Sequence, residues 1–212
     1  MLSCRVTSLK PSLCSLKVKE SLASIANLKA RVKASLIVNG QKVYEDLGEV
    51  LFKNDALSGI VIFQLSSIMS RYHFSNYQIS LDLLPTFSIT EIQEYLDNFH
   101  SLKGLFPKMI GQYILKRSIN SSNLEIATTI KNLTFNVLEP YDFKNAQITS
   151  GGVSFKDLTD TLENKYFPNC YIMGEMLDGD GICGGYNLQF AFASANVVFK
   201  DIIKKVGIIN ER

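Results

Sequence analysis

The sequence predicts a mixed α and β fold, in which a β-rich part is followed by a helical part and then by a glycine-rich loop that opens a long helix. Three observations support this prediction. Apolar and polar residues alternate at residues 32–38 and 77–83, which is the pattern of half-buried strands. Apolar residues recur at helical spacing over much of residues 88–130. Seven of the 13 glycines lie between Gly151 and Gly185.

The β-rich part is expected to contain a hairpin at residues 30–48. Asn39 and Gly40 lie between its alternating segments and supply the two positive-φ residues of a type I′ turn. Residues 48–52 predict another strand. The apolar run at residues 60–65 fits a strand or a helix, because periodicity does not separate the two in so short a run.

Residues 88–130 are predicted to form a small helical subdomain. Ser88 and Glu91 have the spacing of a capping box, in which the serine hydroxyl and the glutamate carboxylate close the first turn of a helix. Pro107 suits the first turn of a second helix. A short strand is expected at residues 133–137, where apolar residues alternate again.

The glycine-rich part is predicted to hold a polar cofactor. An apolar strand at residues 170–173 is followed by the carboxylate of Glu175, and a helix is expected from about Asn187 to Val206, with Gly207 as its C-cap. Glycine lets the main chain come close to a ligand, and a helix N-terminus offers free N–H groups. This combination suits a cofactor that binds against bare backbone.

Composition and charge argue against several classes of function. The chain has 212 residues, of which 46% are apolar and 20% are charged, as in an ordinary globular protein. The net charge of +2 argues against a nucleic-acid partner. No apolar run approaches the roughly 18 residues that span a bilayer, and the start of the chain does not resemble a signal peptide. No membrane partner and a cytoplasmic location are therefore expected.

No metal site is expected. The four cysteines show no metal-ligand spacing and should be free thiols in the cytosol. His73 and His100 are expected at the surface, and they are too few for a zinc site or a His-dependent triad. Residues 178–181 resemble the start of a calcium loop. However, Ile182 and Gln189 stand where such a loop needs an oxygen ligand and a bidentate glutamate.

Three motifs together resemble a known family. They are Thr149-Ser150-Gly151-Gly152-Val153, Gly174-Glu175-Met176-Leu177-Asp178-Gly179-Asp180-Gly181 and Gly184-Gly185-Tyr186-Asn187-Leu188-Gln189. Their order and spacing resemble the C-terminal signature of the BaiN-like and aminoacetone-oxidase-like FAD-dependent oxidoreductases, which are two-dinucleotide-binding flavoproteins. The resemblance covers nearly the whole chain, but only the C-terminal half of the family.

The resemblance implies an α+β / α/β fold. Residues 1–87 would form an inserted β-barrel-like subdomain, with residues 9–13 as the passage into it and a helix starting near Ser58. Residues 88–138 would form a small helical subdomain and a return strand. Residues 139–212 would supply the C-terminal strands and helix of a Rossmann-like FAD domain.

The resemblance also implies a set of FAD-binding residues, but no catalytic residue. Glu175 would accept hydrogen bonds from the ribityl hydroxyls of the flavin; an exposed loop glutamate is the alternative. Backbone N–H groups at the start of the last helix would stabilise negative charge on the reduced flavin, and an N-cap role for Asn187 is compatible with this. The predicted set is Gly151, Gly152, Gly174, Glu175, Asp180, Gly181, Gly184, Gly185, Tyr186, Asn187 and Leu188.

The roles of the other loop residues are less sharply defined. Gly151 and Gly152 would let the chain approach either the cofactor or the glycine loop, and a plain turn is the alternative. Asp178 and Asp180 would shape the turn and help to anchor the cofactor. Cys183 is expected to be an incidental small residue, because it has no Cys-x-x-Cys partner.

The sequence contains no Gly-x-Gly-x-x-Gly turn, which in such flavoproteins binds the ADP half of FAD. The chain is therefore expected to be a truncated gene product, an expressed fragment, or one half of an enzyme whose other half is a separate chain.

The expected function is that of the C-terminal portion of an FAD-dependent oxidoreductase that transfers hydride on a small organic substrate. Two reactions stay open: reduction of an activated C=C bond with NAD(P)H, and oxidation of a small amine by oxygen. The expected partners are the substrate and an N-terminal FAD-binding half, in cis or in trans. The alternative is a catalytically inactive fragment or a stand-alone binding module with a vestigial flavin motif.

Overall fold

The computed structural model describes residues 3–72 and 76–207. The contacts within the chain form two compact units. The barrel unit comprises residues 14–141. The terminal unit comprises, of the described residues, 3–13 and 142–207.

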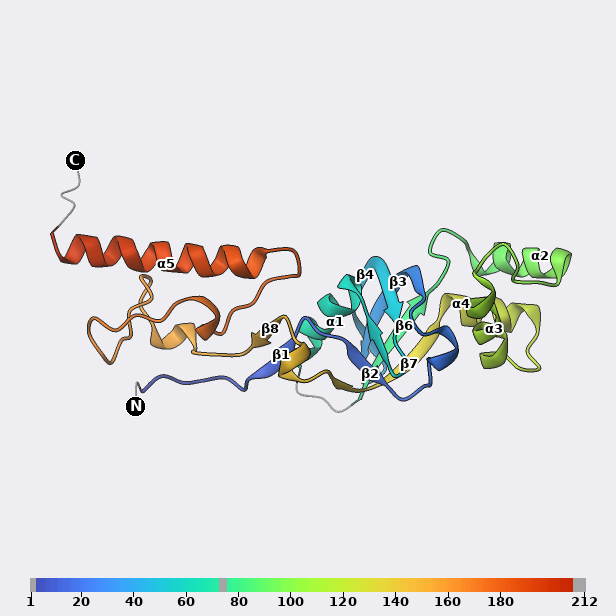
Figure 1. Cartoon of the computed structure of the whole chain (residues 1–212), viewed down its shortest axis with the longest axis horizontal. Coiled ribbons are helices and arrows are strands. Elements are labelled where there is room, and N and C mark those ends of the chain that lie inside the picture. Colours follow the sequence, from blue (N-terminus) through green and yellow to red (C-terminus); the bar gives the residue numbers. More distant parts are fainter. Residues whose placement is uncertain (1–2, 73–75, 208–212) are drawn as a thin grey trace. The chain divides into compact units, whose positions relative to one another are not determined.

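In the described part of the chain, six strands of the barrel unit close into an antiparallel barrel (Figure 1). In order around the barrel the strands are β2 (Leu16–Val18), β5 (Ala56–Ser58), β4 (Gln41–Phe52), β3 (Lys29–Val38), β6 (Tyr77–Asp82) and β7 (Leu133–Pro140). The closed barrel confirms the expected β-barrel-like subdomain. Closure pairs the backbone groups of every strand with a neighbour.

The predicted hairpin joins β3 to β4. Asn39 has a φ of 50° and Gly40 a φ of 80°, so both residues adopt the left-handed conformation that a type I′ turn requires. The hairpin prediction is confirmed. The separate strand predicted at residues 48–52 is wrong, because these residues continue β4 without a break.

The ambiguous apolar run at residues 60–65 is helical and belongs to α1 (Ile60–Ser70), which packs on β3 and β4. The chain turns from β5 into α1 at Gly59, where φ is 102°. A Cβ atom there would lie 2.4 Å from the carbonyl oxygen of Glu49. Glycine is therefore required at this turn.

Three helices lie between strands β6 and β7 along the chain. They are α2 (Ile89–Phe99), α3 (Lys108–Arg117) and α4 (Asn123–Lys131). The predicted capping box of α2 is present, because Ser88 Oγ accepts the N–H of Glu91 and the Ser88 N–H donates to Glu91 Oε2. A second capping box at Ser122 and Glu125 starts α4 and was not predicted. Pro107 is the N-cap of α3 rather than a residue of its first turn.

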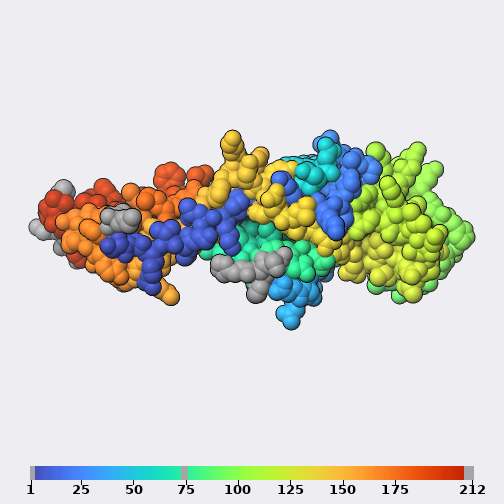
Figure 2. Space-filling view, turned by 90° about the horizontal axis from the view of Figure 1, so that it is seen from below, coloured from blue at the N-terminus to red at the C-terminus, as the bar shows by residue number. Residues whose placement is uncertain are grey.

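One continuous core joins the barrel to the three helices. Phe52 and Phe135 are fully buried in the barrel, and Ile92 and Ile114 of the helices belong to the same cluster of buried side chains. In Figure 2 the helical segment, coloured green to lime, continues the surface of the barrel. The domain boundaries expected near residues 87 and 138 stay a prediction.

The terminal unit consists of short segments beside helix α5 (Tyr186–Lys205). Strand β1 (Lys10–Ser12) pairs antiparallel with β8 (Ile148–Ser150). Buried Leu158, Ile172 and Leu177 form a small separate core. The short 3-10 helices of the chain are η1 (Ala23–Ile25) in the barrel unit and η2 (Phe143–Asn145), η3 (Phe155–Asp157) and η4 (Gly174–Met176) in the terminal unit.

The strand predicted at residues 170–173 is wrong. Within the described residues, only Tyr171 makes a strand-type contact there, as an isolated bridge to Glu163. The chain then turns into η4 at Gly174, where φ is 67°. A strand needs a neighbour with free backbone groups, and an apolar sequence pattern does not reveal whether that neighbour is present.

Helix α5 confirms the long helix predicted from about Asn187 to Val206 to within one residue at each end. Its C-cap is Val206 and not the predicted Gly207; Gly207 is the next residue, with a φ of 73°. No helix in the described ranges, α5 included, is both long enough and apolar enough to cross a membrane.

Replacing Phe52 by alanine should lower the free energy of unfolding by about 3–5 kcal/mol, because the phenyl ring is 0% exposed inside the barrel. Urea unfolding followed by circular dichroism measures this change. Leu47→Ala is the matched control on the same strand, since Leu47 is 58% exposed and should change stability by less than about 0.5 kcal/mol. Equal losses in the two variants would contradict the assigned core.

Candidate functional site

A cavity of about 280 Å³ lies in the terminal unit, where the end of β1, the start of β8, the glycine loop at residues 179–185 and the first turns of α5 meet. Most of its wall comes from one continuous stretch of the chain. The lining residues are Leu13, Gln147, Ile148, Glu175, Gly179, Asp180, Cys183, Gly184, Gly185, Asn187, Leu188, Phe190 and Ala191.

Helix α5 begins at this cavity without a side-chain cap. Its N-cap is Gly185, which has a left-handed φ of 91°, and no side chain of the described residues bonds the first N–H groups of the helix. A Cβ atom on Gly185 would have no neighbour within 4 Å, so the residue borders open space. Free N–H groups and the positive end of the helix dipole therefore face a place where a polar or negatively charged ligand fits.

Asn187 fastens the glycine loop to the helix and is not the N-cap, which corrects the expected capping role. It is the second residue of α5. Its Oδ1 accepts the N–H of Gly181 at 2.8 Å, and its Nδ2 donates to the Gly181 carbonyl at 3.1 Å. The side chain is therefore committed to the loop and does not reach the helix backbone. A Cβ atom on Gly181 would lie 3.0 Å from Tyr186 Cβ, so a larger residue would push the loop off the helix.

Glu175 lies in η4 at the edge of the cavity. Its Oε1 accepts the N–H of Thr149 at 2.6 Å, which ties η4 to β8. Its Oε2 accepts no hydrogen bond from the described residues. One carboxylate oxygen thus orients the side chain, and the other remains for donors on a ligand.

Gly151 and Gly152 bring the chain's own backbone segments together. A Cβ atom on Gly151 would lie 2.3 Å from the Ser8 carbonyl oxygen, and one on Gly152 would lie 2.6 Å from the Met176 carbonyl oxygen. Their φ angles of 93° and 145° also favour glycine. These contacts are with the N-terminal segment and with the end of η4, and not with the glycine loop at residues 179–185. Neither residue lines the cavity.

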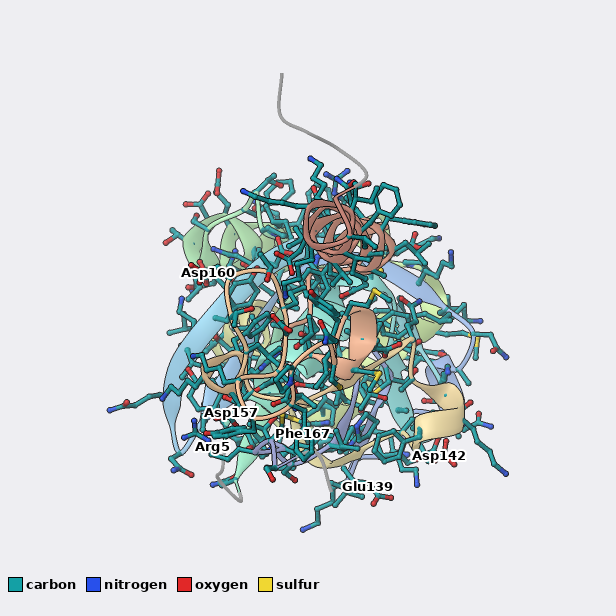
Figure 3. The ribbon with its side chains drawn as sticks, turned by 90° about the vertical axis from the view of Figure 1, so that its left-hand side faces the viewer. Arg5, Glu139, Asp142, Asp157, Asp160 and Phe167 are labelled. Atoms are coloured by element: carbon teal, nitrogen blue, oxygen red, sulfur yellow. The ribbon has the colours of Figure 1, made fainter. Side chains whose placement is uncertain are left out.

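Arg5 and Asp157 hold the N-terminal segment against η3 (Figure 3). The guanidinium Nη2 lies 2.6 Å from Asp157 Oδ1, and the Arg5 backbone N–H donates to Oδ2 at 2.7 Å. The side-chain hydrogen bonds from Arg5 lower the pKa of the Asp157 carboxyl to about 2. The same segment then bonds Gly152, since the Thr7 N–H donates to its carbonyl at 2.9 Å.

Three further hydrogen bonds hold α5 against Tyr171 and Gly174. The N–H of Gly174 donates to Ser194 Oγ at 2.9 Å. Nearer the C-terminal end of the helix, Tyr171 Oη donates to Asp201 at 2.5 Å, and Lys205 Nζ bonds the Tyr171 oxygen at 2.8 Å. The hydrogen bond to Asp201 raises the pKa of Tyr171. None of these residues lines the cavity, so we assign them a structural role.

The structure brings about half of the predicted site residues to the cavity. Those that line it are Glu175, Asp180, Gly184, Gly185, Asn187 and Leu188; those that do not are Gly151, Gly152, Gly174, Gly181 and Tyr186. Their role in FAD binding stays a prediction. Phe190 and Ala191 were missed, although they follow Asn187 at helical spacing and share its face. Leu13 and Gln147 were missed because β1 and β8 meet only in the folded chain.

Cys183 was expected to be incidental, but it lines the cavity, with its Sγ 3.5 Å from Gln147 Oε1. All four cysteines are free thiols in the structure. Within the described ranges, no three His, Cys, Asp or Glu side chains gather to hold a metal ion. His73, one of the two histidines weighed above, lies outside the described residues.

Comparison with known proteins identifies the family. Residues 13–200 match the family model described as "HI0933-like protein Rossmann domain". The chain belongs to the HI0933-like family of FAD-dependent oxidoreductases. This confirms the resemblance to BaiN-like flavoproteins, and it adds a Rossmann-like domain to the observed barrel.

Three curated proteins are similar to the chain. The 3-dehydro-bile acid delta(4,6)-reductase of Clostridium scindens is 30% identical over 209 residues, which cover 87% of this chain and 51% of the relative. The ribosomal RNA dihydrouridine synthases of Escherichia coli and Haemophilus influenzae are 29% and 28% identical, and the matches cover 78% and 74% of this chain and 44% and 42% of theirs. The chain thus spans about half the length of the curated relatives it matches.

Alanine at Gly152 should cost about 3 kcal/mol of stability, because its Cβ would collide with the Met176 carbonyl in a conformation that strains any L side chain. Alanine at Gly185 should cost only about 1 kcal/mol. Its Cβ would meet open space, so only the positive φ of the backbone opposes the substitution. Urea unfolding of both variants measures the difference. Similar losses would contradict the tight contact assigned to Gly152.

The Arg5–Asp157 pair should contribute stability that depends on pH. The Asp157 pKa falls from an unfolded value of about 3.9 to about 2, so the contribution is complete above about pH 5 and disappears as the pH falls towards 2. Calorimetry of the chain and of Asp157→Asn should therefore give melting temperatures that differ most above pH 5 and converge at acidic pH. A gap that stays constant from pH 6 to pH 2 would contradict the assigned ion pair.

Proposed function

We propose that this chain forms the flavin-binding cavity of an oxidoreductase that reduces an activated C=C bond in a small organic substrate. One observation carries the proposal: the uncapped start of α5, the open side of Gly185 and the free oxygen of Glu175 meet at one cavity. This cavity lies in a chain of an FAD-dependent oxidoreductase family. Its donors and acceptors suit the polar part of a flavin rather than a metal ion or an apolar ligand.

The residues at the cavity fit part of FAD. Glu175 Oε2 suits the ribityl hydroxyls, because it accepts no bond from the described residues. The N–H groups at the start of α5 suit the polar edge of the flavin ring, and Gly184 and Gly185 leave room beside them. The cavity volume of about 280 Å³ lies just below the roughly 300–1,000 Å³ of pockets that enclose whole ligands. Other contacts must therefore come from elsewhere.

Bound FAD would supply the hydride chemistry, and the chain would supply binding and electrostatics. The helix N-terminus of α5 stabilises negative charge, which builds up on a flavin ring when it is reduced. The apolar part of the cavity wall limits the access of water to it. It includes Leu13, Ile148 and Phe190. Glu175 orients the ligand through its free oxygen, while its bond to Thr149 keeps the carboxylate in place.

The names of the relatives favour reduction over amine oxidation. One relative is named a delta(4,6)-reductase and two are named dihydrouridine synthases. Both names denote the addition of hydrogen to an unsaturated ring. We therefore prefer a conjugated C=C bond as the reacting group and NAD(P)H as the electron donor. The expected absence of a nucleic-acid partner stays a prediction, and a uracil ring in RNA is the rival substrate.

A dinucleotide-binding half is the partner that completes this site, either on the same polypeptide or on another. Two observations support it. The relatives are about twice as long as this chain. In addition, one face of α5 presents an apolar row to solvent at helical spacing. The row consists of Leu188, Phe192, Phe199, Ile202 and Val206, with exposed fractions from 41% to 72%.

The alternative is an inactive fragment or a stand-alone binding module whose flavin motif is vestigial. It predicts that the chain binds no flavin even when a dinucleotide-binding half is present. The co-production experiment below separates the two functions.

The chain should bind flavin in about equimolar amount when it is co-produced with the part of the Clostridium relative that lies outside the match. Glu175→Gln should lower flavin retention at least about tenfold, because it removes the free carboxylate oxygen. The visible absorption spectrum of the purified complex measures both. Glu139→Gln is the control, since Glu139 lies in β7 of the barrel unit.

A colourless complex that still contains both halves would contradict flavin binding and favour the stand-alone module. Full flavin retention by Glu175→Gln would contradict the role of that residue alone. With the yellow complex, oxidation of NADPH in the presence of a conjugated ketone, an RNA uridine or a primary amine plus oxygen separates the reaction classes.

A further inference from the structure

A second cavity lies in the barrel unit, away from the glycine loop in the sequence. Its volume is about 420 Å³, and it lies between the tight turn at residues 101–106 and the first three turns of α3. The turn is held by N–H bonds from Leu105 and Phe106 to the Leu102 carbonyl. Nothing in the flavin chemistry proposed above uses this groove.

The floor of the groove is apolar. Leu102, Phe106 and Leu115 line it, and Gly111 lets the turn lie close to the helix, because its Cβ position is 3.4 Å from Leu102 Cβ. Leu102 and Gly111 are buried and fix the floor in place. Leu115 is 44% exposed, so part of the apolar wall remains open to a ligand.

The rim of the groove is cationic and lacks a counter-ion. Lys103 and Lys108 line it, and neither ammonium group has a hydrogen-bond or ion-pair partner among the described residues. The sequence has no acidic residue between Asp97 and Glu125, whereas it has four basic ones there. The two charges therefore attract a negatively charged group to this rim.

Two neutral donors stand beside the lysines. Ser101 Oγ already accepts the N–H of Lys103 at 3.0 Å, so its hydroxyl proton is free to donate outward. Gln112 also lines the groove, and its side-chain amide offers two further donors. Cations and neutral donors beside an apolar floor match a carboxylate attached to a hydrocarbon body.

We propose that this groove binds a small amphipathic carboxylate, with its hydrocarbon body on Leu102, Phe106 and Leu115 and its carboxylate between Lys103 and Lys108. The volume lies within the range of small-molecule pockets. A protein partner would need a much wider surface, of about 800 Å² on each side. The site does not depend on flavin binding, so its test is independent of the function proposed above.

An NMR titration of the whole chain with octanoate tests the proposal. Octanoate should shift the amide signals of residues 101–115, and Lys103→Gln combined with Lys108→Gln should weaken binding at least about tenfold. Both lysines are exposed, so this variant should keep its fold, which circular dichroism checks. Lys116→Gln is the matched control, because Lys116 is exposed on the same helix but does not line the groove. It should change the affinity by less than about twofold.

A neutral analogue, a cationic analogue and a lipid surface complete the test. Octan-1-ol and octylammonium should bind at least about tenfold more weakly than octanoate, because neither carries the negative charge that pairs with the two ammonium groups. Equal binding of octanol, or unchanged affinity in the double variant, would overturn the proposal. It would also be overturned if octanoate shifted only α5 residues, or if phosphatidylglycerol vesicles bound residues 101–115 while octanoate did not.

Discussion

The candidate cavity depends on backbone contacts between segments that lie far apart in the sequence. Gly152 is held between the N-terminal segment and the loop before α5, so close to the Met176 carbonyl that no side chain fits. Without this contact the end of β8 and the end of η4 would separate, and Glu175 would lose its bond to Thr149. The glycines therefore act first on the fold, and of the seven at residues 151–185 only Gly179, Gly184 and Gly185 border the cavity itself.

Local signals in the sequence predicted local structure well. Asn39-Gly40 and the Ser88–Glu91 capping box each involve residues a few positions apart, and both form as expected. The strand at residues 170–173 failed for the opposite reason, because strand pairing depends on a distant neighbour. Asn187 has the residue type of an N-cap, but its side chain bonds Gly181. The competition between these two partners is not visible in the sequence.

The candidate site was predictable in part for the same reason. The glycine loop and the start of α5 are contiguous, so the motif located six of the cavity residues. Gly179, Cys183, Phe190 and Ala191 of the same stretch also line it. The rest of the wall comes from Leu13 and the start of β8, which reach the cavity through the β1–β8 pair. Family membership then supplies the cofactor class, and the exposed apolar row of α5 is where we propose that the dinucleotide-binding half packs.

Hydrogen–deuterium exchange at the start of α5 tests the central claim most directly. The complex of this chain with a dinucleotide-binding half would be compared with and without FAD. The account predicts that the amides of residues 183–188 become protected when FAD binds, because the uncapped N–H groups of the helix donate to it. Amides around Gly152 should change little, since they already bond within the chain. Unchanged exchange at residues 183–188 in a complex that holds FAD would contradict the account.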